Sequence, residues 1–417
     1  MAKVLFVPSV GRGIIQFKLI LDELNKGGKH TVTAVAIDKG RASSLKEEGF
    51  LPRDIADYHT KNMLNIIRKE TPDILVTDFS APETINLINA ARYVGIPSLM
   101  IDCGIKSGST PIVQSHNKHL LNKFMAWLKS GQKFQSFPFF LATLPATSKP
   151  WQLPGKLLRE AINFFHGLPG YVEGLDIAVL SPAAKEWFAR DGIPPEHLFT
   201  IGQPRFDLIQ KQEYDQKRLQ MELGIPKDKG IIILATQPMV ESYLWTEKDR
   251  EKFIQVIVGG MKDFPDKQLV IKLHPDENID IYRRLLNNIG DDRTVICREA
   301  DIYELLNACD LLITFYSTVA LEAMLFNKPV ITVNLFSKTD IFPYAQSGAA
   351  IGVYQEKELV PAIKKALYDN SVREELAKKS RAFTCEQIYK PDGQASKRGA
   401  ELILQLVEQA AAKKKSV

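Results

Sequence analysis

One stretch of sequence, residues 268–335, constrains the fold more than any other, because strand and helix patterns alternate within it over short distances. Its first apolar run, QLVIKL, ends at His274, and a later run, DLLITF, ends just before Ser317. A helical pattern, VALEAMLF, and a further apolar run, PVITVNL, follow directly. Short apolar runs that stop at polar turns and alternate with helices predict a parallel sheet with helices on its faces.

The same alternation extends over the rest of the chain, which has 417 residues. Near its start, KVLFVP and the run at 31–37 are predicted strands, and two later runs end at Asp78 and Asp102. A chain of this length exceeds what one hydrophobic core usually organises, so two β/α domains are predicted. The predicted domains are residues 1–206 and 207–385, with a helical segment at 386–417 that can pack back on the first domain.

Charge and cysteine content exclude several classes of protein. The net charge of +5 is too small to indicate nucleic-acid binding. The cysteines lie far apart without a C-x-x-C pair, which predicts buried free thiols in a reducing cytoplasm. They are Cys103, Cys297, Cys309 and Cys385. No apolar run is long enough to span a membrane and no signal peptide is recognisable, so we expect a cytoplasmic protein that can attach peripherally to the membrane.

The predicted second domain carries the residue types of a phosphate site. A helix that begins near Ser317 and Thr318 offers unpaired N–H groups, a positive dipole end and two hydroxyls. The alternative is that one of these residues only caps the helix. Glu322, one turn later, can accept hydrogen bonds from ribose hydroxyls. Tyr316 lies in the same turn.

Other strand ends of this domain supply further candidates. His274 is followed by a proline that restricts its backbone, and its imidazole can bind a phosphate oxygen or protonate a leaving group. A loop histidine with no such role is the alternative. Thr236 and Gln237 follow the domain's first predicted strand. No metal cluster is recognisable in the sequence, so a metal ion is not expected.

The first domain offers a glycine loop and two carboxylates. Gly11 and Gly13 flank Arg12 after the first strand, where the loop either approaches a ligand or forms a plain tight turn. Asp78 and Asp102 end parallel strands and therefore face the edge at which α/β sheets bind ligands. Both are candidates for a general base; for Asp78, the residue assigned that role, a helix cap or a hydrogen bond to a loop is the alternative.

Residues 103–172 differ from the rest of the chain, because eight Lys or Arg and ten aromatic residues occur there with a single acid, Glu160. This insertion suits an anionic membrane surface or a lipid-linked acceptor. The alternatives are packing on its own domain, a subunit interface that makes a homodimer, or single-stranded nucleic acid, which is the least favoured. The candidate contacts are Lys118, Lys123, Phe124, Trp127, Lys133 and Trp151.

Three motifs carry a resemblance to a known superfamily. KLHP, followed by YSTVALEAMLFNKPVITVNL, resembles the donor domain of GT-B glycosyltransferases. GQPRFD at the domain junction, which contains Arg205, resembles CDP-glycerol glycerophosphotransferases and nonhydrolysing UDP-N-acetylglucosamine 2-epimerases. The resemblance implies a GT-B fold, in which two Rossmann-like domains face each other across a cleft.

The resemblance also implies roles for individual residues. In enzymes similar to lipid A disaccharide synthase the matching positions hold the nucleotide, which here are Ser317, Thr318 and Glu322. His274 is implied to contact the donor phosphate or nucleotide. DFSAPE resembles the strand end at which such enzymes carry an aspartate base, which here is Asp78.

The expected function is transfer of a sugar from a UDP- or CMP-linked donor to a membrane- or lipid-linked glycan acceptor in cell-surface polysaccharide synthesis. Asp78 would deprotonate the acceptor hydroxyl, which attacks the anomeric carbon, while Ser317, Thr318 and His274 stabilise the departing phosphate. The nucleotide sugar is a substrate, so no cofactor is expected. Two alternatives stay open: an epimerase that acts on the nucleotide sugar alone, and a noncatalytic binding protein.

Overall fold

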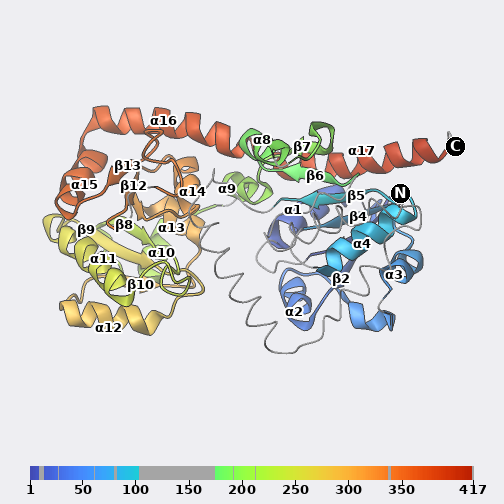
Figure 1. The fold of residues 1–417 in the computed structure, drawn as a ribbon. Coiled ribbons are helices and arrows are strands. Elements are labelled where there is room, and N and C mark those ends of the chain that lie inside the picture. Colours follow the sequence, from blue (N-terminus) through green and yellow to red (C-terminus); the bar gives the residue numbers. More distant parts are fainter. Residues whose placement is uncertain are drawn as a thin grey trace, which may run out of the picture. The chain divides into compact units, whose positions relative to one another are not determined.

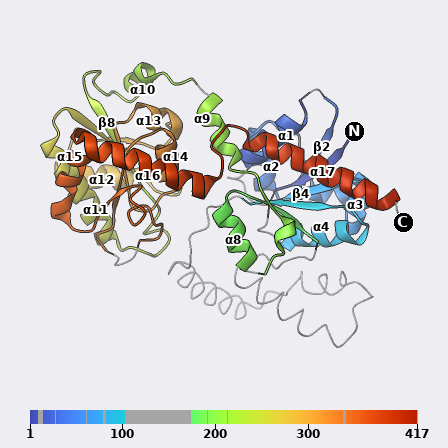
Figure 2. The same ribbon diagram turned by 90° about the horizontal axis from the view of Figure 1, so that it is seen from above.

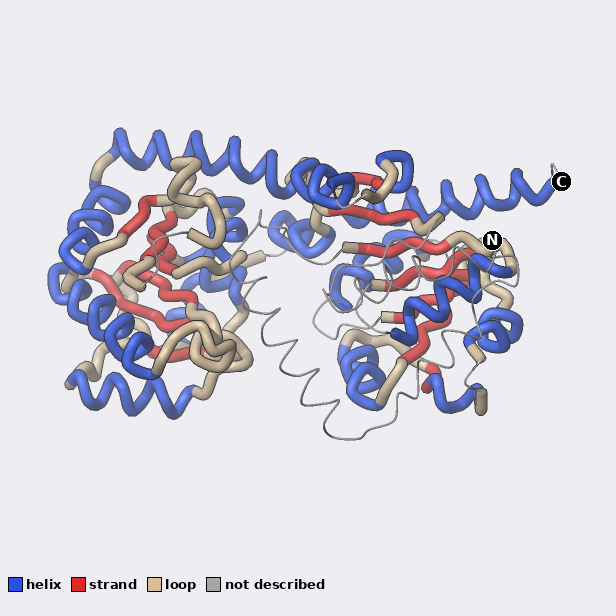
Figure 3. Tube along the Cα trace, viewed as in Figure 1, coloured by secondary structure: helices blue, strands red, loops and turns tan. Residues whose placement is uncertain are grey.

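The computed structural model describes most of the chain in two compact units. The described residues are 1–8, 14–26, 28–60, 62–78, 82–102, 174–190, 192–211, 213–336 and 340–415. The N-terminal unit comprises Met1–Leu208 and Gln387–Val417, and the C-terminal unit comprises Ile209–Glu386. Each unit contains its own sheet, drawn as red strands in Figure 3. The insertion predicted at 103–172 lies outside the described residues.

The N-terminal unit is built on a parallel sheet. Among the described residues, seven strands lie in the order β3-β2-β1-β4-β5-β6-β7. The strands are β1 (Lys3–Val7), β2 (Thr31–Ala36), β3 (Arg53–Asp54), β4 (Ile74–Thr77), β5 (Ser98–Ile101), β6 (Asp176–Val179) and β7 (Leu198–Thr200). The helices are α1 (Ile14–Leu24), α2 (Lys39–Glu47), α3 (Met63–Glu70), α4 (Pro82–Tyr93), α8 (Pro182–Arg190) and α17 (Ala395–Lys415).

Alternate residues of these strands pack on opposite faces of the sheet, as the period of a strand requires. Leu5 of β1 joins a core with α3, α4 and α8, whereas its neighbours Val4 and Phe6 join a core with α1, α2 and α17. Both cores consist of side chains that are almost fully buried. The sheet is therefore covered on both sides, which explains its nearly continuous apolar strands.

Helix α17 reaches the N-terminal unit from the far end of the sequence and lies against α1 (Figure 2). The contact is close at Gly399, where a Cβ atom would lie 2.8 Å from Cδ1 of Ile20. The first residues of α17 are held by Asp207, whose carboxylate accepts hydrogen bonds from the backbone nitrogens of Ala395 at 3.1 Å and Ser396 at 2.8 Å. Asp207 is the last residue of the GQPRFD motif, so that motif anchors the helix.

The C-terminal unit repeats the architecture. Among the described residues, six parallel strands lie in the order β10-β9-β8-β11-β12-β13. The strands are β8 (Gly230–Ala235), β9 (Lys267–Lys272), β10 (Val295–Cys297), β11 (Leu311–Thr314), β12 (Val330–Val333) and β13 (Ile351–Val353). The helices are α10 (Gln216–Glu222), α11 (Glu247–Gly260), α12 (Ile279–Ile289), α13 (Ile302–Ala308), α14 (Val319–Leu325) and α15 (Leu359–Tyr368). The chain passes between the units in α9 (Asp207–Lys211) and α16 (Asn370–Ile388), which are labelled in Figure 1.

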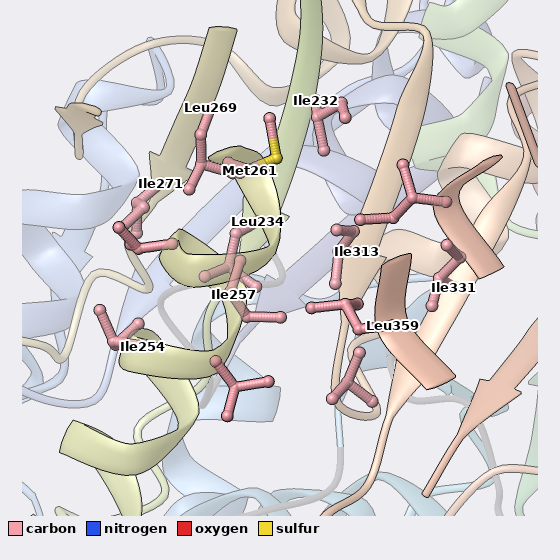
Figure 4. Packing of buried hydrophobic residues seen from close by; sticks show 14 of the residues in the cluster. Ile232, Leu234, Ile254, Ile257, Met261, Leu269, Ile271, Ile313, Ile331 and Leu359 are labelled. Atoms are coloured by element: carbon pink, nitrogen blue, oxygen red, sulfur yellow. The ribbon is translucent and has the colours of Figure 1, made fainter. Parts of the chain in front are cut away.

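One face of this second sheet carries a large apolar core. Ile254 and Ile257 of α11 and Leu359 of α15 pack against Leu234 and Ile313 of the central strands (Figure 4). Each of these side chains is almost fully buried. The core holds the central strands rigidly, and so fixes the positions at which their carboxyl ends emerge.

The prediction of an α/β fold with two parallel sheets is confirmed. The predicted burial of the cysteines is wrong for one of them. Cys297 and Cys309 are buried free thiols, but Cys385 is exposed on α16, because it lies on the face of that helix that does not contact the core. Cys103 lies outside the described residues. Within the described part of the chain, every helix is too short or too polar to cross a bilayer.

Candidate functional site

The strand order of the C-terminal unit defines one preferred place for a ligand. From β8 the chain adds β9 and β10 on one side, and then β11, β12 and β13 on the other. Neighbouring strands leave a crevice at such a switch point, outside their carboxyl ends. Here the switch point lies between β8 and β11, whose last residues, Ala235 and Thr314, are paired in register. Predicted donor residues Gln237 and Ser317 follow these two strands directly.

Polar side chains join the two strands at the switch point. The amide nitrogen of Gln237 donates to Oγ1 of Thr314 at 2.7 Å and to the carbonyl of Ala235 at 3.1 Å. Thr314 donates in turn to the same carbonyl at 3.0 Å. Gln237 is partly buried and Thr314 is fully buried. The side chain of Gln237 therefore lies at the end of β11. The sequence predicted only that Gln237 follows a strand, and not this contact.

The residues after β8 and β9 are joined by a carboxylate that sequence reasoning missed. Glu277 is 1% exposed. Its Oε2 atom accepts hydrogen bonds from the hydroxyl of Thr236 and, at 3.0 Å, from the backbone nitrogen of His274. The same nitrogen lies 3.3 Å from Oγ1 of Thr236. The structure thus brings two predicted residues, Thr236 and His274, together through a third.

The imidazole of His274 is partly exposed, with 31% of its side chain accessible. Its Nδ1 atom accepts a hydrogen bond from the backbone nitrogen of Asp276 at 3.2 Å. A nitrogen that accepts carries no proton, so the neutral ring is protonated at Nε2. This tautomer presents an N–H group of the kind that binds an anionic phosphate oxygen.

The turn after β11 leads into a helix of seven residues, α14, which starts at Val319. The hydroxyl of Ser317 accepts from the backbone nitrogen of Val319 at 3.2 Å, whereas the side chain of Thr318 makes no capping hydrogen bond. Thr318 is exposed and Ser317 is partly buried. Capping is therefore a role of Ser317, and phosphate binding by either residue stays a prediction, as does contact of the donor with the partly buried Tyr316.

Glu322 lies inside α14 and is 4% exposed. Close to it lies the buried Tyr344, whose pKa is raised by burial and further by the charge of Glu322. The hydroxyl of Tyr344 donates to the carbonyl of Ser317 at 3.2 Å. Glu322 is thus enclosed beneath the turn that carries Ser317. Its predicted contact with ribose hydroxyls is not tested by this geometry.

The N-terminal unit places its two candidate carboxylates at the ends of adjacent strands. Asp78 follows β4 and Asp102 follows β5, and they are 2% and 6% exposed. The neighbouring Thr77 donates to the carbonyl of Val7 at 2.7 Å, which ties the end of β4 to the end of β1. Asp78 therefore lies at the switch point of this sheet, between β1 and β4.

Other predicted residues fall elsewhere or outside the described part. Arg205 lies in a short 3-10 helix, Pro204–Phe206, of the N-terminal unit. The glycine loop and the insertion residues are outside the described residues: Gly11, Arg12, Gly13, Lys118, Lys123, Phe124, Trp127, Lys133 and Trp151. Their donor, membrane and acceptor roles stay predictions.

A family model matches residues 181–405, which is more than half of the chain and includes every strand of the C-terminal unit. Its description is CDP-glycerol:poly(glycerophosphate) glycerophosphotransferase. The chain belongs to this family. It is therefore a transferase, as the sequence motifs predicted.

Solved structures similar to this transferase share its fold. A UDP-GlcNAc 2-epimerase from Neisseria meningitidis bound to UDP-GlcNAc has a TM-score of 0.60 and 14% identity, over 98% of this chain and 100% of that one. A variant of the wall teichoic acid polymerase TagF has a TM-score of 0.57 and 14% identity, over 99% and 90%. A glycosyltransferase from Rickettsia africae has a TM-score of 0.55 and 13% identity, over 98% of both chains.

These similarities confirm the GT-B fold predicted for the transferase. At such low identity they establish the fold alone. A comparison with curated proteins gives no match to this chain.

Proposed function

We propose that this transferase moves a sugar or polyol-phosphate unit from a nucleotide-activated donor to a hydroxyl group of a membrane- or lipid-linked cell-surface polymer. The donor would lie at the β8/β11 switch point of the C-terminal unit. Family membership favours a CDP-linked polyol phosphate. The sequence motifs favoured a UDP- or CMP-linked sugar, and both donor types are compatible with the same side chains.

The two donor types differ in the bond that breaks. With a CDP-linked polyol the acceptor oxygen attacks the phosphorus that bears the polyol, and CMP departs. With a nucleotide sugar the oxygen attacks the anomeric carbon, and the nucleotide departs with its phosphate. In both reactions the acceptor loses a proton to a base, for which Asp78 is the candidate, and negative charge develops on a departing phosphate.

One observation carries the proposal: hydrogen-bonding side chains follow β8, β9 and β11 at the carboxyl edge of the C-terminal sheet. Gln237 reaches across to β11, and Nδ1 of His274 accepts a hydrogen bond, which leaves Nε2 of the ring to donate. The N–H group of His274 and the hydroxyls of Ser317 and Thr318 are the donors proposed to stabilise an anionic leaving group. We propose that these side chains, rather than a metal ion, have this role.

A donor panel tests the proposal. The protein is incubated with CDP-glycerol, UDP-N-acetylglucosamine and a CMP-linked sugar, each with and without membrane lipid extract, and products are followed by phosphorus NMR. We expect turnover with at least one donor only when the extract is present. CMP release with a new phosphodiester signal identifies polyol-phosphate transfer, whereas nucleotide release without that signal identifies sugar transfer.

Two outcomes would overturn the proposal. Conversion of UDP-N-acetylglucosamine to its 2-epimer without an acceptor would show an epimerase. Donor binding with no turnover under any condition would show a noncatalytic binding protein.

We also propose that residues 103–172 attach the transferase to an anionic membrane surface. The segment carries eight Lys or Arg against one acid, together with ten aromatic residues, and basic, aromatic-rich segments bind anionic interfaces. In a flotation assay the protein should rise with phosphatidylglycerol vesicles at low salt and be released as salt screens the charges. Flotation that is absent at low salt, or equal with phosphatidylcholine vesicles, would contradict this assignment.

A further inference from the structure

The carboxylate of Glu277 receives donors from three separate elements. Thr236 follows β8, His274 follows β9, and Tyr282 lies on α12. The hydroxyl of Tyr282 donates to Oε1, while Thr236 and the backbone nitrogen of His274 donate to Oε2. The sheet already pairs β8 with β9 up to Ala235 and Lys272. One side chain thus connects the residues that follow both strands to each other and to α12.

Glu277 also closes the turn that carries His274. Its backbone nitrogen donates to the carbonyl of His274 at 3.0 Å, and its side chain accepts from the nitrogen of His274 at 3.0 Å. Glu277 and His274 are therefore joined by two hydrogen bonds, one in each direction. The imidazole is fixed within the same turn, because Asp276 donates to Nδ1.

Helix capping does not explain the carboxylate. Helix α12 begins at Ile279, and its N-cap is Asn278, whose side chain accepts from the backbone nitrogen of Asp280 at 2.9 Å. Burial raises the pKa of Glu277, and the hydrogen bonds from Thr236 and Tyr282 oppose that rise only in part. A carboxyl group that is costly to bury is retained here, and its hydrogen bonds connect the residues that follow the two strands.

A buried arginine extends the network away from the strand ends. Arg250 of α11 is 3% exposed, and its guanidinium carbon lies 5.7 Å from the ring centre of Tyr282. Its Nη2 atom is 2.6 Å from Oε1 of Glu241. Thr236, Arg250 and Tyr282 also line a cavity of about 10 Å³, which is about the space that one water needs. Tyr282 is thus in contact with Arg250 through its ring as well as with Glu277 through its hydroxyl.

We propose that Glu277 is a positioning residue for the transferase reaction, which orients His274 and Thr236 at the donor phosphate and is itself held by Tyr282. The inference rests on the proposed function for its catalytic consequence. Its structural part, that Glu277 orders the turn at His274, is independent of which donor is used.

Two conservative variants test the inference. Glu277→Gln keeps the size of the side chain and removes its charge, and Tyr282→Phe removes one donor and keeps the ring. Glu304→Gln and Tyr303→Phe on α13 are the matched controls, since neither side chain belongs to the network. Amide exchange and imidazole nitrogen signals are measured by NMR without any donor, and the signals of His274 are those missing from His274→Gln.

In Glu277→Gln we expect the His274 amide to exchange at least about 10-fold faster, because its charged acceptor is lost. The kcat should fall about 10- to 100-fold, since a small displacement of a catalytic group has effects of this size. The donor KM should change much less, because other groups also hold the donor. Tyr282→Phe should lower kcat about 3- to 10-fold, the effect of one hydrogen bond.

Several outcomes would overturn the inference. These are unchanged exchange and kcat in both variants, loss of kcat without any change in the His274 signals, or equal losses in the controls. If the unaltered protein turns over no donor, the proposed function fails, yet the NMR signals still decide whether Glu277 orders His274. Altered His274 signals in both variants, with controls unchanged, would support the positioning role even then.

Discussion

The two sheets share one strand order around their switch points but end in different chemistry. In the N-terminal unit β4, beside the switch point, and its neighbour β5 are followed by the buried carboxylates Asp78 and Asp102. In the C-terminal unit β8, β9 and β11 are followed by hydroxyl, imidazole and amide groups, and the buried carboxylate of Glu277 bonds Thr236 and the backbone of His274. Topology therefore fixes where a ligand can bind, and the residue types at the strand ends decide what is bound.

The largest effect on turnover is expected when the carboxylate of Asp78, which follows β4 of the N-terminal unit, is removed. Asp78→Asn keeps the shape of the side chain and removes a proton acceptor, so turnover should fall about 100- to 10,000-fold if Asp78 is the base. Binding of the donor, measured by calorimetry, should stay unchanged, because the donor is assigned to the other unit. Asp102→Asn is the matched control, and equal losses in both variants would remove the special role of Asp78.

A somewhat smaller effect is expected at the C-terminal strand end. His274→Ala removes the Nε2–H group, and turnover should fall about 100- to 1,000-fold, the usual effect of removing one donor to a developing anion. Unlike Asp78→Asn, this variant should also bind the donor more weakly. If the two variants have the same effect on donor binding, the division of roles between the strand ends is wrong.

The smallest effect is expected for the hydrogen bonds that hold a helix start in each unit. Asp207→Ala leaves the start of α17 without its buried acceptor, so the free energy of unfolding should fall by about 2 kcal/mol. Hydrogen exchange should accelerate in α17 and α1, and not in the C-terminal sheet. Asp301→Ala removes a comparable cap, on α13, and should accelerate exchange only in the C-terminal unit. If hydrogen exchange becomes faster throughout the protein in either variant, the expectation that each helix start stabilises only its own unit is wrong.

Much of this architecture could be predicted from the sequence, because its signals are local. The sequence marks the ends of β11 and β9 directly, because one apolar run stops at Thr314 and the other stops before His274. The polar residue that follows each strand is found in the same short stretch of sequence. Alternation with helices predicts parallel strands, whose carboxyl ends lie at one edge of the sheet, and so that edge was predictable as the place for a candidate site.

The missing part of the site depends on distant partners. Glu277 bonds Thr236 across 41 positions, and Gln237 bonds Thr314 across 77. In the sequence, Glu277 is one of several acids in a polar turn, and nothing local distinguishes it from the exposed Asp276 beside it. The exposure of Cys385 was missed for a related reason, since it depends on which face of α16 meets the core.

The packing of Gly399 against Ile20 bears on how the protein folds as it is synthesised. The C-terminal unit is one continuous segment, Ile209–Glu386, and can fold once that segment has left the ribosome. The N-terminal unit is translated before it, yet the core that α1 and α2 form on one face of its sheet stays incomplete until Ala395–Lys415 arrives. During that interval Ile20 and its apolar neighbours are open to chaperones and to aggregation. Of the two units, the N-terminal unit is therefore the first to be started on the ribosome and the second to be completed.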